Sequence, residues 1–475
     1  MADFTQSENH AARFEALGWN TITVTDANNM KAVDAALEKA KGLKNGKPTL
    51  IIARTLIGKG IPEVEGTNAA HGEAGVPFQK SSRASLGLPA DELFYVAPET
   101  KDFFAQKKQE LKAKYDAWQS NYAKWKSANP ELATDLEGAK AKNYPSADEV
   151  LAAIPVYDAK KNVATRQSGS DILQFVAKLV PNYVSGSADL HGSNKNYINK
   201  GENFGNPKIA GKSFKGRNFY FGIREHAMGT MLNGIAYYGL NRASGSTFLV
   251  FADYMRAALR VAALSELPVS YILTHDSVGV GEDGPTHQPV EATSGLRIIP
   301  NLDVIRPADP EEVAGAFAAS IDRSNGPTAL IFSRQNVRTL NEISVEDRRK
   351  GTLAGGYIAK KETAPLTHIL LAAGSELQWA MDAAVQLGDS VRVVSMPCFE
   401  RFDRQTQEYK DSVLPPSTRK RVAIEAGVTG LWYKYVGIDG KVIGTDKFGF
   451  SAPGDTVMKA FGITTENVVN VAKSL

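Results

Sequence analysis

The chain has 475 residues, which is too long for one hydrophobic core and predicts roughly three domains. Its 55 basic and 52 acidic side chains leave a formal net charge of +3, so the composition does not support a nucleic-acid-binding or membrane-surface protein. The single cysteine, Cys398, excludes an internal disulfide, and no apolar run approaches the ~20 residues of a membrane span, so we expect a cytoplasmic protein.

Strand and helix signals alternate near the N-terminus. Residues 19–24 and 48–53 are typical of strands, and residues 29–42 have the apolar spacing of an amphipathic helix. Two parallel strands joined by a helix form a βαβ unit, which needs further sheet beside it to be stable. Residues 101–143 are rich in Lys, Ala, Glu and Trp and predict a helical connector between domains.

Two further blocks of alternating strands and helices follow. In the first block, the sequence predicts helices over residues 165–179, 225–238 and 248–260, and strands over residues 182–186, 218–222, 267–273, 302–305 and 327–332. In the second block, it predicts strands over residues 367–372, 391–395 and 421–425. The fold class is therefore α/β, with successive doubly wound parallel sheets and binding sites at the carboxyl ends of the strands.

The most informative segment is the polar loop at residues 274–291, which directly follows a predicted buried strand. Its titratable residues are His275, Asp276, Glu282, Asp283, His287 and Glu291. Such a density of titratable groups on a Gly-rich loop at a strand end favours an α/β active site over an ordinary polar loop. The G-x-G-x-x-G spelling at residues 279–284 lacks the helix and later acid of a dinucleotide site, so we reject that interpretation.

Other polar clusters also follow predicted strands, at residues 187–193, 224–225 and 333–334, and all should gather on one edge. Glu225 either stabilises a helix N-terminus or is a buried carboxyl in an aromatic pocket. The aromatic residues for such a pocket are Phe248, Phe251 and Tyr254, although their spacing by three favours core packing. Arginines at element boundaries, such as Arg166 and Arg334, either form ion pairs or bind phosphate.

Together these residues resemble the transketolase family, whose members use thiamine diphosphate to move two-carbon ketol units between sugar phosphates. The likeness covers nearly the whole chain. The matching motifs lie at residues 186–190 with Ser193, 221–225, 246–251 with Tyr254, 274–277, 281–289, 333–336, 395–397, 425–427 and 432–435. The implied domains are a remnant of the diphosphate-binding domain at residues 1–95, a helical linker at 96–150, a pyrimidine-binding domain at 151–340 and a C-terminal transketolase domain at 341–475.

The resemblance also implies residue roles. Glu225 would hydrogen-bond N1′ of the aminopyrimidine and would be catalytic together with His287 and His71. The residues expected to bind the cofactor are Glu225, Phe248, Phe251, Tyr254 and Asp189. The residues expected to bind the substrate are Arg166, Ser193, His275 and Arg334 on the phosphate, Asp283 and His287 on sugar hydroxyls, and His71 in the substrate channel.

One family motif is missing from the sequence. The Gly-Asp-Gly segment that, with a later Asn, holds Mg²⁺ and through it the diphosphate does not occur among the 475 residues. Thiamine diphosphate and Mg²⁺, or Ca²⁺ in its place, are therefore expected as cofactors without any metal ligand in this chain. The resemblance then implies a truncated enzyme or one part of a split enzyme. Such an enzyme would act on sugar phosphates, either as a homodimer or in a complex with a separate chain that carries the diphosphate-binding domain. It would have no nucleic-acid or membrane partner. The alternatives are a catalytically inactive, transketolase-like binding or regulatory protein and an enzyme like deoxyxylulose-phosphate synthase.

Overall fold

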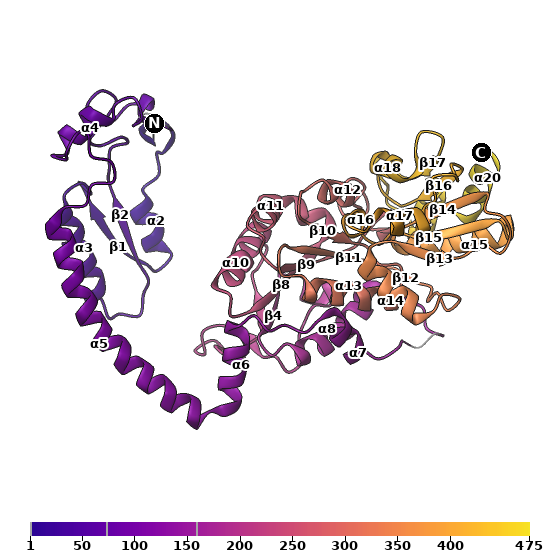
Figure 1. Ribbon diagram of the computed structural model, residues 1–475, viewed down its shortest axis with the longest axis horizontal. Coiled ribbons are helices and arrows are strands. Elements are labelled where there is room, and N and C mark those ends of the chain that lie inside the picture. The colour runs from indigo at the N-terminus through magenta and orange to yellow at the C-terminus, as the bar shows by residue number, and fades with distance from the viewer. Residues whose placement is uncertain (1, 73–74, 158–159) are drawn as a thin grey trace. The chain divides into compact units, whose positions relative to one another are not determined.

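The computed structural model describes residues 2–72, 75–157 and 160–475. The chain divides into two compact units, Met1–Trp125 and Lys126–Leu475, and each unit is described by itself (Figure 1). In the described part of the chain, no helix has both the length and the apolarity needed to cross a membrane.

The first unit contains the predicted βαβ arrangement. Strands β1 (Asn20–Val24) and β2 (Thr49–Ala53) pair in parallel, and α3 (Met30–Gly42) connects them. Helix α3 begins after Asn29, whose side chain accepts hydrogen bonds from two backbone N–H groups of the first turn. Ala36 of α3 packs against the sheet, and the other helices of this unit are α1 (Ala2–Thr5), α2 (His10–Ala16), η1 (Asn68–Ala70) and α4 (Gln79–Ser85).

The predicted connector is two helices rather than one, α5 (Pro98–Ala128) and α6 (Pro130–Lys140). They are interrupted at Asn129 because Pro130 lacks a backbone N–H and its ring favours the first turn of a new helix. No described residue of α5 is buried, whereas α6 buries Ala133 and Ala139.

The main sheet of the second unit has eight strands in the order β10-β11-β9-β8-β4-β7-β5-β6, and neighbouring strands run parallel. The strands are β4 (Tyr183–Ser187), β5 (Asn203–Phe204), β6 (Lys212–Ser213), β7 (Asn218–Tyr220), β8 (Arg242–Phe248), β9 (Val269–Thr274), β10 (Asp303–Ile305) and β11 (Thr328–Phe332). Each predicted strand of this block therefore exists within a few residues of its expected bounds.

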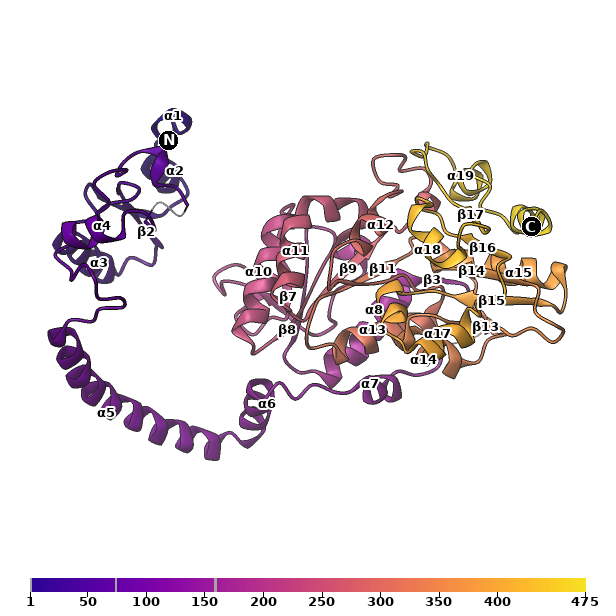
Figure 2. The ribbon, with the colours of Figure 1, turned by 45° about the horizontal axis from the view of Figure 1, so that its top comes forward.

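Helices cover both faces of this sheet (Figure 2). On β9, Tyr271 and Leu273 pack into a core with α10 (Glu225–Tyr238), α11 (Arg256–Leu264) and α12 (Ala292–Arg297). On the same strand, Ile272 packs into the opposite core with α7 (Ala147–Ala153), α8 (Thr165–Leu179) and α13 (Pro310–Asp322). This alternation confirms the doubly wound arrangement, since successive side chains of a strand point to opposite faces.

One central strand is not predicted. Strand β8 contains the small polar run Ser244-Gly245-Ser246 and is buried along its whole length. Ser244 Oγ donates to Ser185 Oγ of the neighbouring strand at 3.0 Å, and a Cβ added to Gly245 would lie 2.3 Å from Leu232 Cδ1 of α10. The helix predicted over residues 248–260 is a 3-10 turn, η2 (Leu249–Met255), followed by α11.

A smaller sheet forms the C-terminal part, with strand order β13-β15-β14-β16-β17. Its strands are β13 (Tyr357–Lys360), β14 (His368–Ala372), β15 (Val391–Ser395), β16 (Arg421–Ile424) and β17 (Lys441–Ile443). Its helices are η4 (Gly374–Glu376), α15 (Leu377–Leu387), α16 (Phe399–Asp403), α17 (Gln407–Val413), η5 (Gly430–Trp432), α18 (Tyr433–Val436), α19 (Gly454–Ala460) and α20 (Thr465–Lys473). The edge strand β13 is antiparallel to β15, so this sheet is mixed rather than purely parallel.

The remaining elements of the second unit lie outside the two sheets. They are η3 (Val278–Val280), α9 (His191–Asn194), α14 (Val345–Ala354) and an antiparallel pair of β3 (Val163–Ala164) with β12 (Asn336–Val337). The predicted third α/β block is thus present, and it belongs to the same compact unit as the second block.

Candidate functional site

The carboxyl ends of four neighbouring strands, β11, β9, β8 and β4, lie at one edge of the main sheet. A cavity of about 450 Å³ opens there, lined by Arg166, Ser193, Phe248, His275, Asp283, His287 and Arg334. All seven residues were expected at a site from the sequence alone. The expectation that polar clusters after different strands gather on one edge is therefore confirmed.

The start of α8 is tied to the end of β11, which brings Arg166 to the cavity. The backbone N–H of Thr165 donates to Ser333 Oγ at 3.0 Å, and the backbone N–H of Ser333 donates to Thr165 Oγ1 at 2.6 Å. Arg166 Nη1 then donates to the backbone carbonyl of Ser193 at 2.8 Å. Burial, followed by the positive charge of Arg334, lowers the pKa of Arg166. Two guanidinium groups at one cavity repel each other, and a bound anion would relieve that repulsion.

His275 directly follows β9 and has a left-handed backbone with φ +64°, which is rare for a non-glycine residue. Its Nδ1 lies 2.8 Å from Thr274 Oγ1, and this hydroxyl donates to Asn194 Oδ1 at 2.8 Å. Because the hydroxyl proton is used on Asn194, His275 Nδ1 is the donor and Nε2 is left as an acceptor. Burial, followed by the positive charges of Arg166 and Arg334, lowers the pKa of His275 to about 3, so the imidazole is neutral at pH 7.

A row of aromatic rings leads away from His275. The Phe248 ring centroid lies 3.7 Å from that of His275 and 5.6 Å from that of Phe251, which in turn lies 5.9 Å from Tyr254. The His287 ring meets Phe251 edge-on at 5.5 Å. Tyr254 is 70% exposed, so the core packing favoured by the spacing is wrong for this residue. The aromatic row is therefore buried at Phe248 and open to solvent at Tyr254.

Glu225 lies next to this row rather than in the cavity lining. It is the first residue of α10, only 7% exposed, and its Oε1 accepts a hydrogen bond from Thr247 Oγ1 at 3.3 Å. Thr247 precedes Phe248 at the end of β8, so a single strand end carries both the partner of the carboxyl and the first ring of the row. The arrangement can hold a flat heterocycle against rings with a carboxyl at its edge.

The C-terminal part shapes the loop that carries Asp283 and His287. Gln288 Nε2 donates to the carbonyl of Gly281 at 2.6 Å and to that of Phe450 at 3.0 Å. Gly281 has φ +82°, and a Cβ added there would lie 2.8 Å from the backbone nitrogen of Gly454. The loop that carries the two cavity residues is therefore packed closely on residues 449–454, and glycine is needed at the point of closest approach.

Besides Glu225, Phe251 and Tyr254, two predicted site residues do not line the cavity. Asp189 follows β4 with a left-handed backbone, φ +66°, and its side chain is exposed. His71 belongs to the first unit, where it is exposed at the end of η1. Among residues 2–72, 75–157 and 160–475, no group of three or more His, Cys, Asp or Glu side chains is arranged to hold a metal ion.

The sequence reasoning missed three residues that position the site. Asn194 and Thr274 orient the His275 ring, and Thr247 contacts Glu225. The strand-end rule could have found Thr247 and Thr274, because both precede residues that were singled out. For Asn194 the sequence offers only a weaker indication of a role in the site, namely its position next to Ser193.

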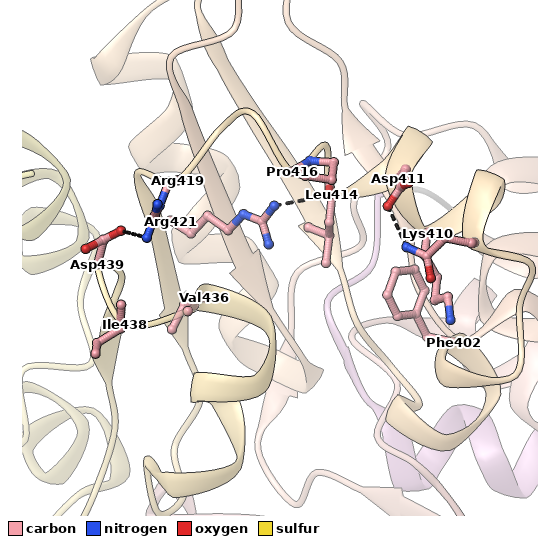
Figure 3. Close-up of a pocket in the computed structure, with 12 residues that line it drawn as sticks. Phe402, Lys410, Asp411, Leu414, Pro416, Arg419, Arg421, Val436, Ile438 and Asp439 are labelled. Atoms are coloured by element: carbon pink, nitrogen blue, oxygen red, sulfur yellow. Dashed lines mark hydrogen bonds and ion pairs between the residues drawn. The ribbon is translucent and has the colours of Figure 1, made fainter.

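Other hollows lie outside this cavity. One of them, of about 970 Å³, shares Arg334 with the cavity and extends toward Trp379 and Lys459 of the C-terminal part. Another hollow, of about 330 Å³, lies near the amino end of β16, and its lining residues are drawn in Figure 3. There Arg421 already donates to backbone carbonyls and Arg419 pairs with Asp439, so these cations are not available to a ligand in this arrangement.

Comparison with known proteins gives three family-model matches. The transketolase thiamine diphosphate binding domain matches residues 1–145, the transketolase pyrimidine binding domain matches residues 161–339, and the transketolase-like C-terminal domain matches residues 355–464. The prediction that most of the diphosphate-binding domain is missing is not supported, because the model of that domain matches the first 145 residues.

Individual relatives match over the whole chain. A transketolase of Dictyostelium discoideum is 57% identical over 473 residues, which are 100% of this chain and 70% of the relative. A transketolase of Physarum polycephalum is 55% identical, again over 100% of this chain and 70% of the relative. A solved structure of transketolase from Pichia stipitis in complex with sedoheptulose 7-phosphate is 34% identical with a TM-score of 0.91, over 100% of this chain and 69% of that one.

Proposed function

Because this chain belongs to the transketolase family, we propose that it transfers a two-carbon ketol unit reversibly from a ketose phosphate to an aldose phosphate, with thiamine diphosphate as cofactor. The observation that carries the proposal is the cavity at the carboxyl edge of the main sheet. It combines two guanidinium groups, two imidazoles, a carboxylate and the end of an aromatic row.

The cationic side of the cavity would bind the sugar phosphate. Arg166 is already oriented by the carbonyl of Ser193, and its repulsion from Arg334 would be relieved by a phosphate dianion. His275 is neutral, with Nε2 as an acceptor, and it can donate to a phosphate only after taking up a proton. We propose that phosphate binding raises the pKa of His275, because the dianion offsets the two arginine charges that, after burial, lower this pKa.

The opposite side would bind the sugar chain. Asp283 and His287 line the same cavity, and a carboxylate beside an imidazole can accept and donate hydrogen bonds to neighbouring hydroxyls. His287 would also move a proton on the reacting oxygen, since it is the imidazole nearest to Phe251 in the aromatic row. For His71 in the first unit, a place in the substrate channel is proposed from family resemblance alone.

The aromatic row would hold the aminopyrimidine of the cofactor. Phe248, Phe251 and Tyr254 offer ring faces and edges, and the exposed Tyr254 leaves one end open for the ligand. Glu225 would hydrogen-bond N1′, with Thr247 fixing one carboxyl oxygen so that the other is directed to the ring. Asp189 would support the rim. The cofactor, when bound, supplies the electron sink for carbon–carbon bond cleavage.

The metal and the diphosphate need ligands of their own. The sequence has no Gly-Asp-Gly, and the described residues hold no metal-binding group of His, Cys, Asp and Glu. We therefore propose that the 475-residue chain by itself binds thiamine diphosphate with Mg²⁺ only weakly, as one part of a truncated or split enzyme. Calorimetric titration of the isolated chain with both ligands tests this proposal, and micromolar binding would refute it.

An apolar face next to α10 supports a homodimer. Phe219, Phe221, Met231, Ile235 and Tyr238 line a hollow of about 420 Å³, and Met231 and Tyr238 are 55% and 75% exposed. Such a cluster of exposed apolar side chains is typical of an interface between protein chains. Light scattering should give twice the 51.3 kDa mass, and Met231→Glu should return the chain to a monomer. A monomeric wild-type chain would contradict the dimer.

The reaction itself is tested by choice of substrates. The transketolase proposal predicts turnover of xylulose 5-phosphate with ribose 5-phosphate when the chain is supplied with a diphosphate-binding domain. It predicts no turnover of pyruvate with glyceraldehyde 3-phosphate, the pair expected for an enzyme like deoxyxylulose-phosphate synthase. No turnover of either pair in that assembly would favour an inactive binding protein instead.

A further inference from the structure

We propose that Arg306, which does not line the cavity, is a positioning residue that holds His275 through Asp276 and is itself held by the C-terminal sheet. The C-terminal part of the chain would then act on the proposed phosphate site through one buried ion-pair network, and in this respect the inference rests on the proposed function.

The network begins at the strained residue. His275 has a left-handed backbone, a conformation that is unfavourable for a non-glycine residue and persists only where its surroundings hold it. On its N-terminal side, Thr274 and Asn194 orient the ring. On its C-terminal side, Asp276 Oδ2 accepts from Arg306 Nε at 3.1 Å and from Arg306 Nη2 at 2.7 Å. Arg306 thus fixes one of the two neighbours of His275 with a two-pronged, charge-assisted contact.

The rest of the Arg306 guanidinium points into the C-terminal part. Nη1 donates to the carbonyl of Ala373 at 2.8 Å, directly after β14, and it also pairs with Glu376 and with Glu425. A Cβ added to Gly374 would lie 2.5 Å from Arg306 Cζ, and Gly374 has φ +65°. Only glycine fits there, so the backbone after β14 is shaped around this guanidinium.

The anchors of Arg306 are fixed in turn. Glu425, which follows β16, forms a bidentate pair with Arg297 at 2.6 and 3.0 Å and accepts from Trp432 Nε1 at 2.8 Å. The Arg297 guanidinium lies over the Phe399 ring, 3.8 Å from its centroid. The side chains of Arg306, Asp276, Glu376 and Glu425 are each at most 3% exposed, so solvent cannot replace a lost partner.

The network is specific in its connections. Arg297 and Arg306 share Glu425 and are both buried, but of the two only Arg306 contacts Asp276. The positioning role therefore predicts that the state of His275 depends on Arg306 and not on Arg297.

The test uses the whole 475-residue chain, labelled with ¹⁵N in its seven histidines. The resonances of His275 are identified by their loss in His275→Gln. Arg306→Lys keeps the positive charge but loses the planar guanidinium that donates two hydrogen bonds to Asp276. We expect this substitution to shift the His275 resonances. The matched control Arg297→Lys should leave these resonances in place. Affinity for ribose 5-phosphate should fall roughly 5- to 30-fold in Arg306→Lys, as for a lost or misdirected hydrogen bond, and less than twofold in Arg297→Lys.

A second variant, Asp276→Asn, tests the same inference if Arg306→Lys does not fold. Asp276→Asn keeps the shape of the side chain and removes its charge, and it should shift the His275 resonances in the same way. Unchanged His275 resonances in a folded Arg306→Lys or Asp276→Asn chain overturn the inference. Absent binding of ribose 5-phosphate by the wild-type chain, with shifted resonances in the variants, would refute the phosphate site while leaving the positioning role intact.

Discussion

Replacing Arg166 by Ala tests the phosphate site most directly. The guanidinium of Arg166 is held at the cavity by the carbonyl of Ser193, so its remaining N–H groups are directed before any ligand arrives. A hydrogen bond to a charged group contributes about 1.5–3 kcal/mol, which corresponds to a loss of affinity of about 10- to 150-fold. We expect a loss of affinity at the lower end of this range, because removal of Arg166 also removes its repulsion with Arg334.

The assay is calorimetric titration of the chain with ribose 5-phosphate and, separately, with ribose. Arg166→Ala should weaken binding of the phosphorylated sugar by at least about tenfold and leave ribose unaffected, because only the phosphate carries the charge. Arg260→Ala is the matched control, since Arg260 is an exposed arginine of α11 that does not line the cavity. Binding of ribose 5-phosphate within twofold of wild type by Arg166→Ala would refute the reasoning.

Four other outcomes are expected. Glu225→Gln should lower turnover of an active assembly by at least about 100-fold with an unchanged circular dichroism spectrum, and near-normal turnover would exclude the proton role. The pKa of His275 should be higher in the complex with ribose 5-phosphate than in the free chain, which an NMR titration of its ring nitrogens measures, and an unchanged pKa would contradict this part of the proposal. Unfolded His275 has an ordinary pKa of 6.5 and the folded residue about 3, so its contribution to stability is present above pH 6.5 and is lost as the pH falls. Urea unfolding should therefore show a slope of up to about 1.4 kcal/mol per pH unit between pH 6 and 4 that His275→Gln lacks. Gly245→Ala should destabilise the second unit by about 1–3 kcal/mol through overpacking against Leu232, whereas Gly234→Ala, with open space around its Cβ position, should not.

The candidate site was predictable where function depends on strand ends. An apolar strand followed by polar residues is visible in the sequence, and parallel strands bring such ends together whatever their separation along the chain. Arg166 and Arg334 show the limit of this rule. Each arginine by itself has the sequence context of an ordinary surface or ion-pair arginine at an element boundary, and only the cavity that they share favours the proposed phosphate site.

Two features needed the tertiary structure. Strand β8 has the composition of a turn, and it is a central strand because the small residues Ser244 and Gly245 allow Ser185 and Leu232 to approach closely. Tyr254 has the spacing of a core aromatic residue and is nevertheless exposed, since η2 is a 3-10 turn whose side chains do not follow the α-helical period.

The sequence by itself determined the α/β class, the order of most strands and helices, and the loop at residues 274–291 as the centre of the site, because hydrophobic periodicity and strand-end chemistry are local properties. Tertiary structure alone decided the neutral state of His275 and its connection through Asp276 and Arg306 to Glu376 and Glu425. The physical reason is that burial and ion pairing depend on groups up to 149 positions further along the chain than Asp276, brought together only when the two sheets pack.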